Sequence, residues 1–177
     1  MRVPDPGKSR HRRVSSPLYT AAERRRRDRS PWTVVQGVLA PIQFLVFLVS
    51  VVLVLRYLVA GTGLGAATVS IVVKTLVLYT IMVTGAIWER DVFGVYLFAR
   101  PFFWEDAVSM LVIGLHTAYL VVWLTGALGP RGQMLLALAA YATYVVNATQ
   151  FLLKLRAARR APVRGTGRAA TLVGVAH

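Results

Sequence analysis

The sequence predicts an all-α integral membrane protein, a bundle of four transmembrane helices with a basic tail at each end. The 177 residues are 56% hydrophobic, yet the net charge is +14. The charge is segregated, because ten of the 21 basic residues lie in 1–30 and six in 154–177. Four apolar stretches lie between them. Each reaches the ~20 residues that a helix needs to cross a ~30 Å hydrocarbon core.

The first thirty residues predict a basic tail with one short helix. Residues 1–18 are rich in Arg, Pro and Ser, a composition typical of disorder. Thr20 and Glu23 have the spacing of a capping box, which predicts the start of an arginine-rich helix. Ser30 and Pro31 predict the start of the next helix, with Ser30 as its N-cap and Pro31 at its first position.

A membrane domain follows over 31–158, and a basic tail predicted to be disordered occupies 159–177. The predicted spans are 33–59, 66–88, 106–125 and 133–153. The positive-inside rule places both tails, and with them the 89–105 connection, in the cytoplasm.

The composition excludes several functional classes. The chain has no cysteine, so disulfides, thiolate nucleophiles and Cys-ligated metals are excluded. No phosphate-binding glycine loop, His-Glu metal motif or serine triad is present, and the sequence predicts neither a cofactor nor a metal centre. Topology and anionic lipid explain the tail charge better than nucleic-acid binding does.

Four of the seven acidic residues lie in one connection between apolar stretches: Glu89, Asp91, Glu105 and Asp106. The same connection is rich in aromatic residues. We expect a polar cleft here, opening to the cytoplasmic side and suited to a flat, apolar ligand. Asp106 points ~100° away from Glu105 on a helix, so it also suits the role of an acid favoured by the helix dipole.

Polar residues are energetically costly inside a bilayer, so each one there calls for a structural or functional explanation. Lys74 either snorkels outward or faces the bundle and pairs with an acid or a substrate carboxylate. His116 is the only histidine outside the tails, and it shares a helical face with Glu105. It is either a hydrogen-bonded structural residue or part of the cleft. Asn147 either joins two helices or lines the same cleft.

Several strings of residues resemble the vinyl bacteriochlorophyllide hydratase family, and the similarity covers about residues 17–158. Among them are Ser30-Pro31-Trp32-Thr33, Ile87-Trp88-Glu89, Phe102-Phe103-Trp104-Glu105-Asp106 and Leu115-His116-Thr117-Ala118-Tyr119.

The resemblance implies a hydro-lyase of bacteriochlorophyll synthesis. It would add water across the C3 vinyl group of a chlorophyllide-type Mg-chlorin and give a 1-hydroxyethyl group. It further implies a bacterial inner or intracytoplasmic photosynthetic membrane, and association with other pigment-synthesis enzymes. Hydration transfers no electrons, which agrees with the absence of a redox cofactor.

The roles of residues are our hypotheses. Glu105 is the predicted proton donor, and His116 or Glu89 the partner that activates water. His116 could instead ligate the magnesium of the substrate. Lys74 is predicted to hold the propionate carboxylate.

The remaining predicted substrate-binding residues are Asp106, Asn147 and Trp104. Two competing interpretations remain open. One is a non-catalytic membrane carrier or assembly protein for chlorophyll precursors. The other is a proton-linked transporter that uses Lys74, His116 and Asn147 as a relay.

Overall fold

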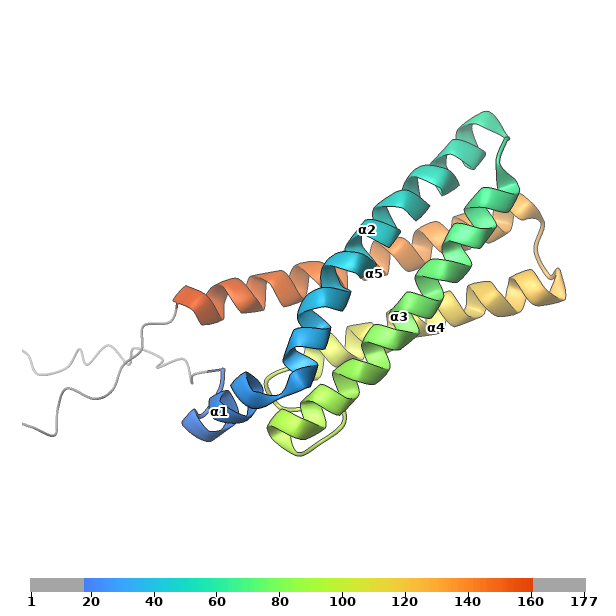
Figure 1. Ribbon diagram of the computed structural model, residues 1–177. Helices are drawn as coiled ribbons and strands as arrows, with labels where there is room; N and C mark the ends of the chain where they lie inside the picture. Colours follow the sequence, from blue (N-terminus) through green and yellow to red (C-terminus); the bar gives the residue numbers. More distant parts are fainter. Residues whose placement is uncertain (1–17, 161–177) are drawn as a thin grey trace, which may run out of the picture.

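The computed structural model describes residues 18–160, and the regular structure in that range consists of α-helices alone (Figure 1). The helices are α1 (Ala21–Arg29), α2 (Pro31–Ala60), α3 (Leu64–Phe93), α4 (Phe103–Thr125) and α5 (Pro130–Arg160). The disorder predicted for the two tails falls largely on 1–17 and 161–177, outside the described residues.

The four predicted spans are confirmed, since α2 to α5 are long and apolar enough to cross a membrane. Each helix continues past its predicted apolar stretch at one or both ends. The physical reason is that a helix satisfies its own backbone hydrogen bonds, so it can run on into the polar interface after the apolar sequence has ended.

The helix starts confirm the predictions. Thr20 and Glu23 form the predicted capping box, with backbone N to side-chain oxygen distances of 3.2 and 2.7 Å. Ser30 is the N-cap residue of α2 and Pro31 begins the helix, as predicted. The Ser30 side chain makes no cap hydrogen bond. Its backbone N–H donates a hydrogen bond to the Arg26 carbonyl at 2.9 Å, which ends α1, so Ser30 joins the two helices.

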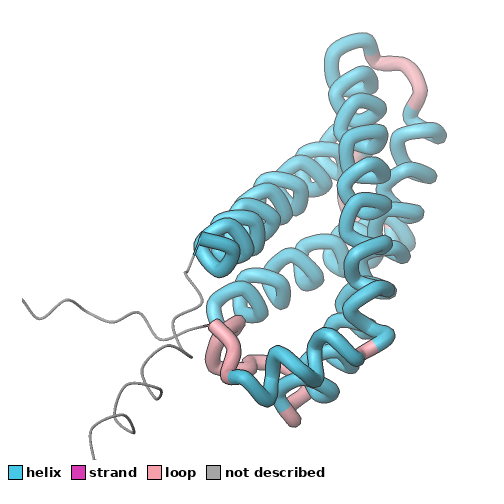
Figure 2. The backbone as a smooth tube through the Cα atoms, turned by 60° about the vertical axis from the view of Figure 1, so that its left-hand side comes forward, coloured by secondary structure: helices cyan, strands magenta, loops and turns pink. Residues whose placement is uncertain are grey.

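The helices form two antiparallel hairpins, α2 with α3 and α4 with α5, and the hairpins cross each other (Figures 1 and 2). Gly61 ends α2 at φ +69° and Gly94 ends α3 at φ +84°, conformations that favour glycine. Between the hairpins, α5 packs on α2 and α4 packs on α3. The crossing brings side chains of all four long helices to one central region.

The polarity of the bundle suits a bilayer. Large apolar side chains cover its outer surface, among them Leu45, Val49, Val59 and Leu124. Polar side chains such as Gln43 are instead fully enclosed. A membrane domain can expose apolar groups to lipid, so its interior becomes the place where polar groups are held.

The predicted cytoplasmic end is covered by an aromatic cluster. Tyr19, just before α1, stacks on Phe93 at the end of α3, with ring centroids 5.8 Å apart. Phe102 packs against both, and Phe151 of α5 stacks on Phe102. α1 is thereby fixed on the end of the bundle, next to the connection that carries the acidic residues.

Candidate active site

Three buried carboxyl groups lie where α3 ends and α4 begins. Glu89 sits one turn before the end of α3, and Glu105 and Asp106 lie in the first turn of α4. Their exposed fractions are 6, 7 and 4%. The fourth acid of the connection, Asp91, is exposed and lies apart from this group. The fold therefore brings three of the four predicted acids together.

The connection between α3 and α4 folds over these acids. The Ala99 N–H donates to Glu89 Oε2 at 3.2 Å, and the Phe98 N–H donates to Asp106 Oδ2 at 2.8 Å. Phe98 has a φ of +60°, a left-handed conformation that is uncommon outside glycine. Two carboxyl groups thus hold a strained connection in place.

Glu89 and Asp106 are also within hydrogen-bonding range of each other. The pair is therefore a structural link between α3 and α4.

Glu105 has a different partner. Its Oε2 accepts a hydrogen bond from Lys154 Nζ of α5 at 2.5 Å, and the same ammonium donates to the Pro101 carbonyl. This ion pair ties the Glu105 carboxyl group to α5, so the carboxyl oxygen predicted to face a substrate is occupied by a structural contact.

Two predicted substrate-binding residues differ from these acids in their surroundings. Trp104 is 72% exposed on the surface of α4. Asn147 Nδ2 donates to Ser109 Oγ at 2.8 Å, so it joins α5 to α4, as one of its two predicted roles required.

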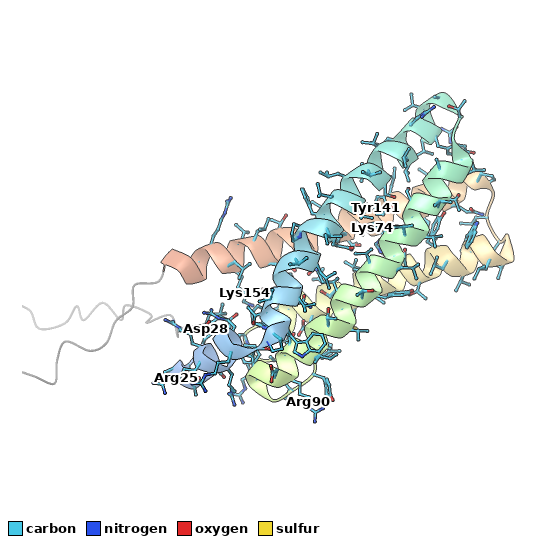
Figure 3. The ribbon with its side chains drawn as sticks, viewed as in Figure 1. Arg25, Asp28, Lys74, Arg90, Tyr141 and Lys154 are labelled. Atoms are coloured by element: carbon cyan, nitrogen blue, oxygen red, sulfur yellow. The ribbon has the colours of Figure 1, made fainter. Side chains whose placement is uncertain are left out.

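A second polar group lies deep in the bundle, centred on Lys74 of α3 (Figure 3). Lys74 faces the bundle and has no exposed surface, which decides between its two predicted orientations. Its Nζ lies 4.0, 5.4 and 5.8 Å from the ring centroids of Tyr144, Tyr141 and Phe47. Ring faces attract a cation, so this aromatic cage stabilises an ammonium group. Among the described residues, no acid pairs with it.

His116 of α4 lies beside the aromatic cage, with its ring centroid 5.8 Å from that of Tyr141. It is fully buried, and its Nδ1 lies 2.8 Å from the Val112 carbonyl oxygen. A carbonyl can only accept, so neutral His116 carries its proton on Nδ1. Nε2 then has a free lone pair, and it has no partner among the described residues.

Gln43 of α2 completes this deep site. It is 2% exposed, and neither its amide oxygen nor its nitrogen has a partner in the described part of the chain. It therefore makes neither a helix-joining bond nor a bond to the backbone freed by Pro41. Leaving a buried polar group unpaired costs about 1–3 kcal/mol. Unpaired atoms of Lys74, His116 and Gln43 in one region indicate a place for the polar groups of a ligand.

A chain of hydroxyl groups fixes Tyr141. Its OH lies 2.5 Å from Ser50 Oγ, which lies 2.8 Å from Ser70 Oγ, and Ser70 donates to the Ala67 carbonyl. Because the last acceptor is a carbonyl, Tyr141 donates to Ser50 and Ser50 donates to Ser70. The sequence hypotheses gave no role to either serine. The buried spacing of Gln43, Phe47, Ser50 and Val54 on α2 is the signal that could have found Ser50.

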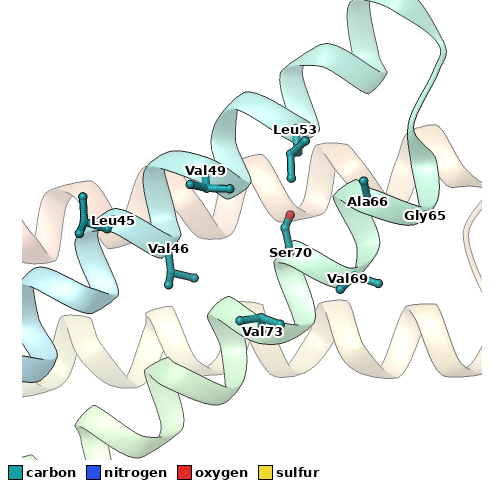
Figure 4. A pocket seen from close by; sticks show the side chains of 9 residues that line it. All are labelled: Leu45, Val46, Val49, Leu53, Gly65, Ala66, Val69, Ser70 and Val73. Atoms are coloured by element: carbon teal, nitrogen blue, oxygen red, sulfur yellow. The ribbon is translucent and has the colours of Figure 1, made fainter.

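The same chain ends at an apolar groove between α2 and α3 (Figure 4). The groove has a volume of about 550 Å³ and is lined by Leu45, Val46, Val49, Leu53, Gly65, Ala66, Val69, Ser70 and Val73. Ser70 is the one side chain with a polar group in this lining. The volume is in the range of small-molecule sites. The groove thus adjoins, through three hydroxyl groups, the aromatic cage around Lys74.

The carboxyl groups and the deep site are separate places. Glu105 and His116 lie on the same face of α4, eleven residues or ~16 Å apart along the helix. The structure therefore divides the predicted residues into an acidic group at one end of the bundle and a Lys74–His116 group near its middle.

Comparisons with known proteins find relatives whose sequences match the part of the chain that forms this membrane domain. The sequence model of the family described as 2-vinyl bacteriochlorophyllide hydratase matches residues 19–157. A protein of that name from Rhodobacter capsulatus is 66% identical over 142 residues, 80% of this chain and 82% of the relative. Another from Cereibacter sphaeroides is 64% identical over 150 residues, 84% of this chain and 90% of the relative.

No solved structure matches the chain. The family match spans α1 to α4 and nearly all of α5, so it includes both the acidic group and the deep site. On this evidence, the chain belongs to the 2-vinyl bacteriochlorophyllide hydratase family.

Proposed function

We propose that this chain is a hydro-lyase that hydrates the C3 vinyl group of a chlorophyllide- or bacteriochlorophyllide-type pigment to a 1-hydroxyethyl group. The observation that carries the proposal is the deep site, in a chain of this family. Lys74 Nζ, His116 Nε2 and the Gln43 amide are buried and lack partners among the described residues. Donor and acceptor groups of this kind are what an addition of water requires.

The reaction transfers no electrons, so it needs no redox group. The terminal carbon of the vinyl group gains a proton, and the carbon attached to the ring gains the oxygen of water. The positive charge that develops between these steps spreads into the macrocycle. The pigment is flat and largely apolar, so it can reach the bundle from the bilayer, where the groove between α2 and α3 opens.

The acidic group has a supporting role in this proposal. Glu105 is ion-paired with Lys154, and Glu89 and Asp106 hold the α3–α4 connection. Their position at the predicted cytoplasmic edge suits contact with the polar edge of the pigment. Trp104 can add a flat apolar surface there, and Asn147 keeps α4 and α5 together.

The proposed location follows from the same reasoning. Four apolar helices and a pigment substrate indicate the bacterial inner or intracytoplasmic photosynthetic membrane. The excess of basic residues towards both ends of the chain supports a cytoplasmic location for both termini. Other enzymes of pigment synthesis are proposed as neighbours, because an apolar intermediate is best passed on within the bilayer.

The test is expression of the full chain in a host that lacks the pathway. Membranes are supplied with a vinyl chlorophyllide, and the pigments are analysed by chromatography and mass. A product heavier by one water, with a blue-shifted red absorption band, is expected from loss of the vinyl conjugation. Membranes without the chain give the background. Pigment that is bound and not converted would instead support the carrier interpretation and overturn the proposal.

A further inference from the structure

We propose that Lys74 donates the proton of this hydration and that His116 activates the water, with the vinyl group of the pigment held between them deep in the bundle. The inference rests on the function proposed above. It assigns the chemistry to the middle of the membrane domain and away from the acidic residues at its end.

The two side chains offer complementary groups. Among the described residues, the N–H groups of Lys74 have no acceptor and the lone pair of His116 Nε2 has no donor. Lys74 Nζ lies 5.4 Å and the His116 ring centroid 5.8 Å from the Tyr141 ring centroid. A donor and an acceptor beside the same ring match the two proton transfers of a hydration.

The aromatic cage explains how Lys74 can hold a proton in an apolar interior without a carboxylate. Three rings stabilise the ammonium, and such contacts are stronger when they are shielded from water. Transfer of the proton moves a localised charge from the lysine into a macrocycle that delocalises it. This relief of buried charge favours the transfer.

The carboxyl groups are less suited to the same task. Glu105 is ion-paired with Lys154. Glu89 and Asp106 each accept a hydrogen bond from a backbone N–H of the α3–α4 connection. An acid that swings away to protonate a substrate would leave Lys154 or one of these N–H groups buried without a partner.

The amphipathic character of the pigment favours a deep vinyl group. A chlorophyllide carries an ionised carboxylate and a vinyl group on different edges of the macrocycle. An ionised group in a bilayer stays at the interface. The apolar vinyl edge then points towards the middle of the membrane, where Lys74 and His116 lie.

The steps balance without another reactant. The π electrons of the vinyl group take a proton from Lys74 Nζ, forming the C–H bond of a methyl group and leaving a cation on the carbon attached to the ring. A lone pair of water forms the C–O bond there, and His116 Nε2 takes the released water proton. Transfer of that proton from His116 to the Lys74 amine restores both residues.

The experiment compares Lys74→Arg, Lys74→Met and His116→Gln with the wild-type chain in lipid nanodiscs. Arginine keeps the charge and can stack on the rings of the aromatic cage, yet it does not release its proton at neutral pH. It therefore separates a proton donor from a group that only binds a carboxylate. Pigment binding is measured by fluorescence quenching, turnover by product formation, and folding by size-exclusion chromatography. Arg56→Met, at an exposed cation of α2, is the matched control.

We expect Lys74→Arg to bind the pigment within about threefold of wild type and to lose turnover by a factor of about 10²–10⁴. His116→Gln is expected to behave in the same way, and Arg56→Met to retain both properties. Turnover by Lys74→Arg within tenfold of wild type would overturn the assignment. So would pigment binding weakened tenfold or more in Lys74→Met, because loss of the cation then removes a carboxylate anchor.

Lys74→Met serves as the second variant. It removes the ammonium without adding bulk to the aromatic cage, so it folds even if arginine does not fit there. It is expected to bind pigment and not convert it, and substantial turnover by this variant also overturns the assignment. Failure of the wild-type chain to hydrate any vinyl pigment would be a failure of the proposed function. Conversion by the wild type and by Lys74→Met alike would refute only the present inference.

Discussion

Glu105 and Lys154 form an ion pair, with the carboxylate Oε2 and the ammonium Nζ 2.5 Å apart, that joins the first turn of α4 to α5. The two side chains are 10 and 22% exposed, so water screens the pair only in part. The same ammonium holds the Pro101 carbonyl and lies 4.7 Å from the Phe102 ring centroid. The pair thus holds the α3–α4 connection in place at the end that leads into α4.

Glu105→Gln is therefore expected to act mainly on stability. Loss of a hydrogen bond between two charged groups lowers the free energy of unfolding by about 1.5–3 kcal/mol. Turnover per folded molecule should stay within tenfold of wild type. Thermal unfolding in detergent and turnover in nanodiscs measure the two effects. A loss of turnover above about a hundredfold with intact pigment binding would restore Glu105 as the proton donor that the sequence suggested.

Asp106 is expected to tolerate asparagine and not leucine. Asn keeps an oxygen that can accept the Phe98 N–H, and its NH₂ can donate to Glu89. Leu removes that acceptor, so its variant should unfold more easily by about 1–3 kcal/mol. Limited proteolysis of the 94–102 connection measures the effect, with faster cleavage expected for Asp106→Leu alone. Equal cleavage of both variants would show that the acceptor does not hold the connection.

The groove between α2 and α3 is expected to matter for pigment entry. Ala66 is exposed in its lining, and Ala66→Trp fills part of its 550 Å³ volume. Pigment binding and turnover should fall together, by about tenfold or more, because one to two kcal/mol of apolar contact is lost. Leu111→Trp, on the lipid-facing surface of α4, is the control. The same result for both variants would argue against this route.

The capping box of α1 should respond to acid. Hydrogen bonds from the Thr20 backbone and side chain hold the pKa of Glu23 below its ordinary value. A lowered pKa in the folded state means that the stabilisation is present above the ordinary pKa. It is lost as the pH falls through the lowered one. NMR titration of the Glu23 carboxyl carbon measures that pKa.

The matched variant for this titration is Glu23→Gln, which keeps the hydrogen bond and cannot titrate. Protection factors of the α1 amides, which are corrected for the pH dependence of intrinsic exchange, should fall on acidification in the wild type and stay constant in this variant. A Glu23 pKa at or above the ordinary value would contradict the prediction.

The sequence alone determined the all-α class, the four spans and the residues that need an explanation. These follow from local properties. Apolar length fixes a span, and the Thr20–Glu23 spacing fixes a cap within one turn. The concentration of acids near Glu105 was also visible, because it depends only on position along the chain.

Only the tertiary structure decided what those residues touch. Lys74 could have faced lipid or the bundle, and the choice depends on the rings of Phe47, Tyr141 and Tyr144 on two other helices. The sequence predicted Glu105 as an unpaired proton donor, whereas in the fold Lys154, 49 residues later, lies beside it. The physical reason is that charge, pairing and burial depend on distances between helices. The spacing of residues along one helix does not specify those distances.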